Sequence, residues 1–266
     1  MNTYLDFVES IQAAVLAGQK ITPSKARTEP VERAAKVLLF SPHPDDECIT
    51  GVLPLRLMRE ADKQIINIPV TYGSNKDRQT ARAEELADAC RLLGWTSYRN
   101  RDDLAGLDTD DIAAILSELK PEIIFVPHVQ DWNPRHISTH TTVVQALQRL
   151  GEACACTVIE TEYWGAMDDP NLMVEADAQT VADLVAATAL HVGEVARNPY
   201  HLLLPAWMQD NVRRGGELVG GPGTAPPPFN FATLYRLRRW ERGGFVEQLD
   251  TGTFIAMETG TLKEIF

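Results

Sequence analysis

The apolar residues of the chain follow two spacings, one typical of amphipathic helices and one typical of buried strands. Helical spacing begins at Tyr4 and stops near Gly18, which predicts an N-terminal helix. Short, mostly apolar runs then predict four strands, at residues 37–40, 65–71, 123–126 and 157–160. Apolar strands of this kind are typical of a sheet that is covered on both faces.

Between the predicted strands, apolar residues recur three and four positions apart. This spacing predicts helices at residues 48–61, 79–93, 110–119 and 139–150. Gly94, Gly151 and Pro121 end three of these helices. The first helix must tolerate Pro54. Short strands that alternate with helices predict a doubly wound, Rossmann-like α/β fold, with a mostly parallel sheet and helices on both faces.

The pattern changes after Tyr163. A long, alanine-rich helix is predicted at residues 176–197 and a second one at 205–215. The Gly- and Pro-rich stretch at 220–228 is predicted to be a loop, either a lid over a cleft or a connector. We therefore divide the chain into an N-terminal helix and connection (1–33), a Rossmann-like catalytic core (34–165), and a C-terminal region of helices and loops packed on the core (166–266).

Charge and composition exclude several classes of partner. The 266 residues carry a formal net charge of −12, which disfavours nucleic acids and anionic membranes because both are polyanions. No run reaches the roughly 20 apolar residues that a membrane helix needs. Four cysteines without CxxC spacing, and the lack of a visible signal peptide, predict a cytoplasmic protein. The sequence leaves a homo-oligomer open.

The stretch SPHPDDEC, from Ser41 to Cys48, follows directly on the first predicted strand. It places one imidazole and three carboxylates within five residues, although adjacent carboxylates repel. A divalent cation would turn this crowding into a stabilisation, whereas a helix cap needs only one acid and no histidine. Doubly wound sheets bind ligands at the carboxyl ends of their strands, so the pattern favours a metal site here. No GxGxxG, Walker lysine or HExxH accompanies it.

The HPDDE at this position resembles the signature of the LmbE-like (PIG-L) family of zinc-dependent de-N-acetylases. The stretch from Arg82 to Gly94 is similar to the R-x-x-E-L-x-x-A-x-x-x-L-G helix of that family, and residues 131–140 stand where the family has H-P-D-H. The resemblance covers about residues 37–160. It implies a Rossmann-like fold, a Zn²⁺ ion, and removal of an acetyl group from an N-acetylglucosamine derivative.

The resemblance also implies roles for single residues. His43 and Asp46 would coordinate zinc, and Asp45 would be the general base that activates the attacking water. Two imidazoles and one carboxylate are the donor set of a catalytic zinc, because they leave a coordination position open. The family's H-P-D-H supplies the second imidazole, so the third ligand depends on how residues 131–140 are aligned.

Without a gap, Asn133-Pro134-Arg135-His136 falls on H-P-D-H, which makes His136 the third ligand. Asn133 then takes the place of the histidine that stabilises the transition state. With one inserted residue, His140 becomes the ligand instead. We prefer the alignment without a gap, and we expect the Asn133 amide or the His140 imidazole to supply the second contact to the oxyanion.

The sequence therefore predicts a zinc-dependent hydrolase that removes an N-acetyl group from a small-molecule amino sugar or sugar conjugate. One alternative is a catalytically impaired sugar- or metal-binding protein of the same fold, motivated by Asn133 and Arg135, and another is a hydrolase of a different amide. Arg82 either holds a substrate group or pairs with Glu85. His191 is predicted to be structural.

Overall fold

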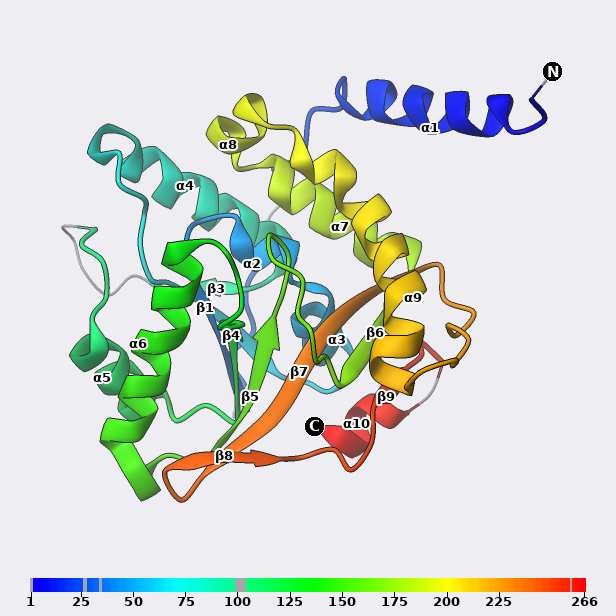
Figure 1. Cartoon of the computed structure of the whole chain (residues 1–266). Helices are drawn as coiled ribbons and strands as arrows, with labels where there is room; N and C mark the ends of the chain where they lie inside the picture. Colours follow the sequence, from blue (N-terminus) through cyan, green and yellow to red (C-terminus); the bar gives the residue numbers. More distant parts are fainter. Residues whose placement is uncertain (1, 26–27, 34, 99–103, 259) are drawn as a thin grey trace.

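The computed structural model describes residues 2–25, 28–33, 35–98, 104–258 and 260–266 (Figure 1). Within these residues the strands form one sheet in the order β3-β2-β1-β4-β5-β7-β6-β9, with β8 beside β7. The strands are β1 (Lys36–Ser41), β2 (Gln64–Pro69), β3 (Thr96–Ser97), β4 (Ile123–Pro127), β5 (Cys156–Thr161), β6 (Leu172–Ala176), β7 (Phe231–Glu241), β8 (Gly244–Glu247) and β9 (Thr253–Ile255).

Helices connect most of these strands. They are α1 (Leu5–Gly18), α2 (Asp46–Ile49), α3 (Val52–Glu60), α4 (Lys76–Leu93), α5 (Thr109–Leu119), α6 (Pro134–Leu150), η1 (Gly151–Ala153), α7 (Ala178–Ala189), α8 (Val192–Arg197), η2 (Tyr200–Leu203), α9 (Leu204–Gly220) and α10 (Thr261–Ile265). The N-terminal helix, the four predicted strands and the α/β alternation are confirmed.

Strands β3, β2, β1, β4 and β5 are parallel, and the chain reverses its direction of travel across the sheet between β1 and β4. Successive β1 residues point to opposite faces of the sheet. Val37 and Leu39 pack with α3, α4 and α7, whereas Leu38 and Phe40 pack with α5 and α6. Both faces are therefore covered, and the reversal between β1 and β4 opens the crevice in which doubly wound folds bind ligands.

Two predicted helices near this crevice have different bounds in the structure. The helix predicted at residues 48–61 is divided into α2 and α3 at Gly51, where an added Cβ would stand 2.7 Å from Leu184 and 2.9 Å from Trp95. Pro54 falls in the first turn of α3, where a missing N–H costs nothing. Helix α6 begins at Pro134, not at residue 139, because Asn133 caps it.

The C-terminal region contributes strands that the sequence did not predict. Residues 172–176 form β6, and the helix predicted at 176–197 is interrupted at His191 between α7 and α8. Strand β7 lies antiparallel to both β5 and β6, so the sheet continues without a break into this region. Helix α9 packs against β7 and β6. The C-terminal region is therefore built on the same sheet as the crevice.

Helix α1 extends away from the body of the molecule (Figure 1). None of its described residues is buried, and Phe7 is 64% exposed. Its C-terminal end approaches the body at Gly18, which faces Leu202 of η2. Within the described residues, no helix combines the length and the apolar character needed to cross a membrane.

Candidate metal centre

Three of the predicted side chains meet at the reversal between β1 and β4. His43 lies in the loop after β1, Asp46 begins α2, and His136 lies in the first turn of α6 after β4. One potential ligand atom from each lies within 4.8 Å of the others. Asp46 Oδ2 is 3.4 Å from both His43 Nδ1 and His136 Nε2. The structure thus brings together the side chains selected by the alignment without a gap.

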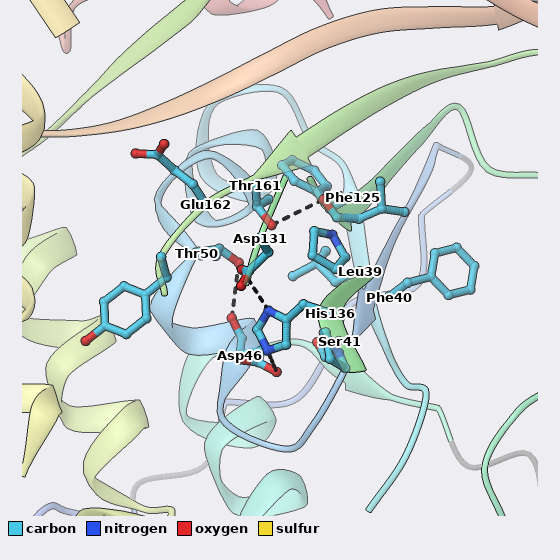
Figure 2. Close-up of a pocket in the computed structure, with 14 residues that line it drawn as sticks. Leu39, Phe40, Ser41, Asp46, Thr50, Phe125, Asp131, His136, Thr161 and Glu162 are labelled. Carbon is cyan, nitrogen blue, oxygen red and sulfur yellow. Dashed lines mark hydrogen bonds and ion pairs between the residues drawn. The ribbon is translucent and has the colours of Figure 1, made fainter. Parts of the chain in front are cut away.

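A buried carboxylate orients His136. Its Nδ1 lies 3.3 Å from Asp131 Oδ2, on the side of the ring away from Asp46 (Figure 2). Asp131 is 4% exposed and also accepts a hydrogen bond from the backbone N–H of Asn133. A proton on Nδ1 is thus shared with Asp131, which leaves the Nε2 lone pair facing Asp46 and His43. The buried His136 Nε2 has no hydrogen-bond partner, so these residues fit a bound cation.

Burial and neighbouring charges shift the pKa values of His136 and Asp46 in opposite directions. Burial favours the neutral forms, but Asp46 and Asp131 raise the pKa of His136 to about 10. In the same way, burial opposes ionisation of Asp46, but His136 and His43 hold the pKa of Asp46 well below its ordinary value. The carboxylate is therefore ionised and attracts positive charge, which a proton or a metal cation can supply.

Asp45 lies beside this group and is 7% exposed. Burial, followed by the neighbouring Asp46 carboxylate, raises the pKa of Asp45 to about 8. A buried carboxyl group with a pKa close to neutral, next to a candidate metal centre, has the properties of a proton-transfer group.

A cavity of about 330 Å³ opens over Asp45 and Asp46, a volume suited to a small molecule. It is lined by His43, Asp45, Asp46, Arg82, Trp132, Asn133, Trp164, Glu194, Arg197, Asn198 and Tyr200. A second cavity of about 300 Å³ is also lined by His43 and has Thr71, Ser74 and Gln79 in its walls. The cleft therefore has one side lined by Trp132, Trp164 and Tyr200 and another that carries hydroxyl and amide groups.

The Gly- and Pro-rich loop after α9 lies away from this cleft. It folds back on its own helix, since a Cβ on Gly216 would stand 2.8 Å from the backbone nitrogen of Pro226. Among the described residues, those that line the two cavities do not include this loop. Its position against α9 is that of a connector rather than a lid.

His140 and Asn133 have different surroundings. His140 is buried one turn beyond His136, and its Nε2 lies 3.0 Å from Glu160 Oε1, which holds it outside the group formed by His43, Asp46 and His136. Asn133 lines the larger cavity, and its Oδ1 accepts a hydrogen bond from the backbone N–H of Arg135. This bond occupies the Asn133 carbonyl and leaves the amide NH₂ as a donor at the cavity.

One of the two interpretations of Arg82 from the sequence expected it to pair with Glu85. The structure does not show this pair. Glu85 Oε1 instead lies 3.2 Å from Arg78 Nη2. Arg82 Nη2 donates to the carbonyl of Pro44 at 3.1 Å, and its Nη1 lies 3.8 Å from Glu194 in the cavity wall. The guanidinium is therefore fixed at the edge of the cleft.

Two residues of the C-terminal region that contact the site were missed from the sequence, as was the role of Asp131. The Tyr200 hydroxyl donates to the Asp45 carboxylate across 155 positions of the chain, and His191 Nε2 lies 2.8 Å from Glu47 Oε1 across 144 positions. His191 was predicted to be structural, with no link to the HPDDE stretch. No local pattern marks either contact, because both depend on how the C-terminal region packs.

The strand order 3-2-1-4-5 and the His–Asp–His group at its reversal define a Rossmann-like protein with a candidate metal centre. Residues 38–147 match the family model described as PIG-L: GlcNAc-PI de-N-acetylase. This segment contains both HPDDE and His136. The resemblance to the PIG-L family is thereby confirmed over this part of the chain.

Solved structures share the fold at low sequence identity. N,N′-diacetylchitobiose deacetylase from Pyrococcus horikoshii matches with a TM-score of 0.56 and 16% identity, over 89% of this chain and 93% of that one. The zinc-inhibited form of teicoplanin deacetylase Orf2 matches with a TM-score of 0.54 and 15% identity, over 77% and 99%. The 4-carboxy-2-hydroxymuconate hydratase GalB from Pseudomonas putida KT2440 matches with a TM-score of 0.55 and 16% identity, over 76% of this chain and 95% of that one. No curated protein sequence matches the chain.

Proposed function

We propose that this protein is a zinc-dependent amide hydrolase that removes an N-acetyl group from a small amino sugar or sugar conjugate. The observation that carries the proposal is the convergence of His43, Asp46 and His136 beside Asp45, with His43, Asp45 and Asp46 in the wall of an open cavity. The PIG-L family match supports the reaction, and the deacetylases among the structural neighbours share the fold that would support it.

His43, Asp46 and His136 would hold the metal, and Asp131 would keep the His136 ring in the required tautomer. When bound to two imidazoles and one carboxylate, zinc polarises a carbonyl oxygen and lowers the pKa of a bound water toward about 7. This donor set leaves room for a substrate oxygen, as in catalytic rather than structural zinc sites.

Asp45 would take a proton from the attacking water and later return it to the leaving amine. Burial raises the pKa of Asp45 above that of an ordinary carboxyl group, which favours a group that both takes and returns a proton. The amide NH₂ of Asn133 would donate a hydrogen bond to the oxygen on which negative charge develops. Arg82, fixed at the cavity edge, would hold a hydroxyl group of the sugar.

A sugar- or metal-binding protein without turnover is the second candidate. It is favoured by one observation, the presence of Asn133 where the resemblance places a histidine. An amide cannot carry the positive charge of an imidazolium, so it stabilises an oxyanion less. The two candidates therefore share a binding site and differ in whether an acetyl group is released.

Metal analysis combined with acetate release separates these candidates. The purified protein is expected to hold one zinc ion per chain and to release acetate from at least one member of a panel of N-acetyl amino sugars and their conjugates. Removing the metal with a chelator should abolish release, and adding zinc back should restore it. A metal-loaded protein that binds a panel member without releasing acetate would establish the second candidate. A protein that neither holds metal nor binds the panel would overturn both.

A further inference from the structure

Asp45 has a backbone conformation that side chains rarely adopt. Its φ of 122° and ψ of −32° lie outside the regions favoured by residues other than glycine. Such a conformation persists only where surrounding contacts enforce it, and it is common at functional sites. The contacts of Asp45 therefore indicate what keeps its carboxyl group in place.

The backbone N–H, the backbone C=O and the carboxylate of Asp45 each form hydrogen bonds. Its N–H donates to Glu47 Oε2 at 2.9 Å, and its C=O accepts from the N–H groups of Cys48 and Ile49 at 3.1 and 3.3 Å. Its carboxylate accepts from the hydroxyl of Tyr200. The carbonyl contacts belong to the first turn of α2, but the other two need side chains that are themselves fixed.

Glu47 is fixed by a residue of the C-terminal region. It is 1% exposed, and its Oε1 lies 2.8 Å from Nε2 of His191, which is 0% exposed. A buried carboxylate without a partner would become neutral or turn toward solvent. Paired with His191, Glu47 keeps its second oxygen directed at the Asp45 N–H.

Glu47, Cys48 and His191 also form a cluster of metal-ligand residue types, but hydrogen bonding explains their spacing better. Ligands of one tetrahedral zinc ion stand about 3.3 Å or more from each other, given metal–ligand distances near 2.0 Å. The Glu47–His191 separation of 2.8 Å is that of a hydrogen bond, and so is the 3.1 Å from Cys48 Sγ to Glu47. The cluster therefore supports Asp45 rather than a second metal.

Tyr200 is fixed by aromatic packing. It is 3% exposed and lies in η2, directly before α9. Its ring makes an edge contact with Trp164 at a centroid distance of 5.6 Å and packs near Tyr163 at 6.4 Å. A ring held on two sides directs its hydroxyl along one line, and that line ends at Asp45 Oδ2.

From these contacts we infer that Tyr200 and His191 are positioning residues for Asp45: Tyr200 holds its carboxylate directly, and His191 fixes its backbone through Glu47. The C-terminal region thereby completes a site whose candidate metal ligands come from the segments that follow β1 and β4. The inference rests on the proposed function in one respect, the role of Asp45 in proton transfer.

Tyr200→Phe tests the direct contact, because it removes one hydroxyl and keeps the ring packing. We expect kcat to fall at least ~10-fold, with KM and zinc content close to those of the wild type, since a misdirected base slows the chemical step and not substrate binding. Tyr235→Phe is the matched control. Tyr235 is also fully buried, but its hydroxyl bonds the backbone of Thr50 and Leu53. This variant should lose stability and keep its kcat.

Two substitutions of His191 test the indirect contact. Glutamine can still donate a hydrogen bond to Glu47, whereas leucine cannot. We expect His191→Gln to retain most of the wild-type kcat and His191→Leu to lose at least ~10-fold, again with zinc retained. Equal loss in both variants would mean that the ring itself, and not its hydrogen bond, is needed, which would overturn this half of the inference.

Crystal structures of the zinc-loaded wild type and of Tyr200→Phe provide a readout that does not depend on activity. The inference expects the Asp45 carboxyl to leave its position in the variant while His43, Asp46 and His136 stay in place. An unmoved Asp45, or an unchanged kcat in Tyr200→Phe, would overturn it. If the wild type releases no acetate, the proposed function fails, and the two structures still decide whether Tyr200 positions Asp45.

Discussion

The parallel and antiparallel parts of the sheet bring residues to the site in different ways. In the parallel part, the carboxyl ends of β1 and β4 meet at one edge, so the loops that follow them bring His43, Asp46 and His136 together. In the antiparallel part, neighbouring strand ends point in opposite directions, and Tyr200 and His191 instead reach the edge from the helical segments between β6 and β7. The first part supplies the candidate metal ligands and Asp45, and the second supplies two of the residues that support Asp45.

This difference has an energetic meaning. Without a metal, a proton on His136 balances the charge of the Asp46 carboxylate, and a cation must displace that proton in order to bind. Supporting residues gain from their contacts whether or not a cation is present. We therefore expect changes in the parallel part to act mainly on metal binding and turnover, and changes in the antiparallel part to act on rate alone or on stability.

The largest effect is expected from His136→Ala. Removing one of three candidate ligands should lower the zinc content to background and abolish acetate release, because the remaining two side chains bind too weakly. Elemental analysis of the purified protein measures this directly. His140→Gln, which can still contact Glu160, should keep the metal. If His140→Gln lost the metal and His136→Ala kept it, the alignment with one inserted residue would be correct.

Asp45→Asn should have the next largest effect. We expect kcat to fall at least ~10²-fold with one zinc retained, because the substitution removes a proton acceptor and not a ligand. Near-normal turnover would place the general base elsewhere. Glu47 would then be the next candidate from the sequence, although its burial against His191 makes it a poor proton acceptor for substrate.

Asn133→Ala should lower kcat about tenfold, which corresponds to about 1.4 kcal/mol of barrier. The substitution removes the α6 cap as well as the amide NH₂. Asn133→Ser separates these roles, since serine caps helices well but does not reach as far into the cavity. Equal kcat in the serine variant and the wild type would show that Asn133 only caps the helix.

The smallest effect is expected where the two parts of the sheet join. Glu160 on β5 accepts from Arg238 on β7 at 2.6 Å and from His140 at 3.0 Å. Burial opposes ionisation of Glu160, but His140 and Arg238 lower its pKa below the ordinary 4.5. Glu160→Gln should therefore cost about 1–2 kcal/mol of unfolding free energy at neutral pH and leave kcat unchanged.

The difference in unfolding free energy between wild type and Glu160→Gln should depend on pH, because the pKa of Glu160 is lowered in the folded protein. A carboxyl with a lowered pKa contributes stability above its unfolded-state value, and this contribution is lost as the pH falls through the lower folded-state value. The difference in unfolding free energy between wild type and Glu160→Gln should thus be constant above about pH 5 and shrink as the pH falls below the ordinary carboxyl pKa of about 4.3. A difference that kept its full size well below that pH would exclude ionised Glu160 as its origin.

Much of the parallel part was predictable from the sequence because its signals are local. The apolar run of β1, the adjacent His43, Asp45 and Asp46, and the cap formed by Asn133 and Pro134 each lie within a few residues. Even so, α6 begins five residues before its predicted start, because the Asn–Pro cap outweighs the polar character of the first turn.

The antiparallel part was less predictable because its structure depends on distant contacts. Strand β7 contains Arg236, Arg238 and Arg239 and does not resemble a strand in the middle of a sheet, but Glu160 and Glu247 pair with two of these arginines. The helical pattern of residues 176–197 continues through His191, and its interruption depends on the contact with Glu47. Glu160 lies 78 positions from Arg238, and Glu47 lies 144 positions from His191.

The backbone of Asp45 also bears on how such a site can change over generations. A chain selected for folding stability alone would place glycine at this position, where positive φ is relaxed, and would gain by the exchange. Aspartate at position 45 therefore opposes stability, as residues chosen for activity often do. Descendants that no longer need the reaction would be expected to drift toward glycine or asparagine here first, while the neighbouring core stays as it is.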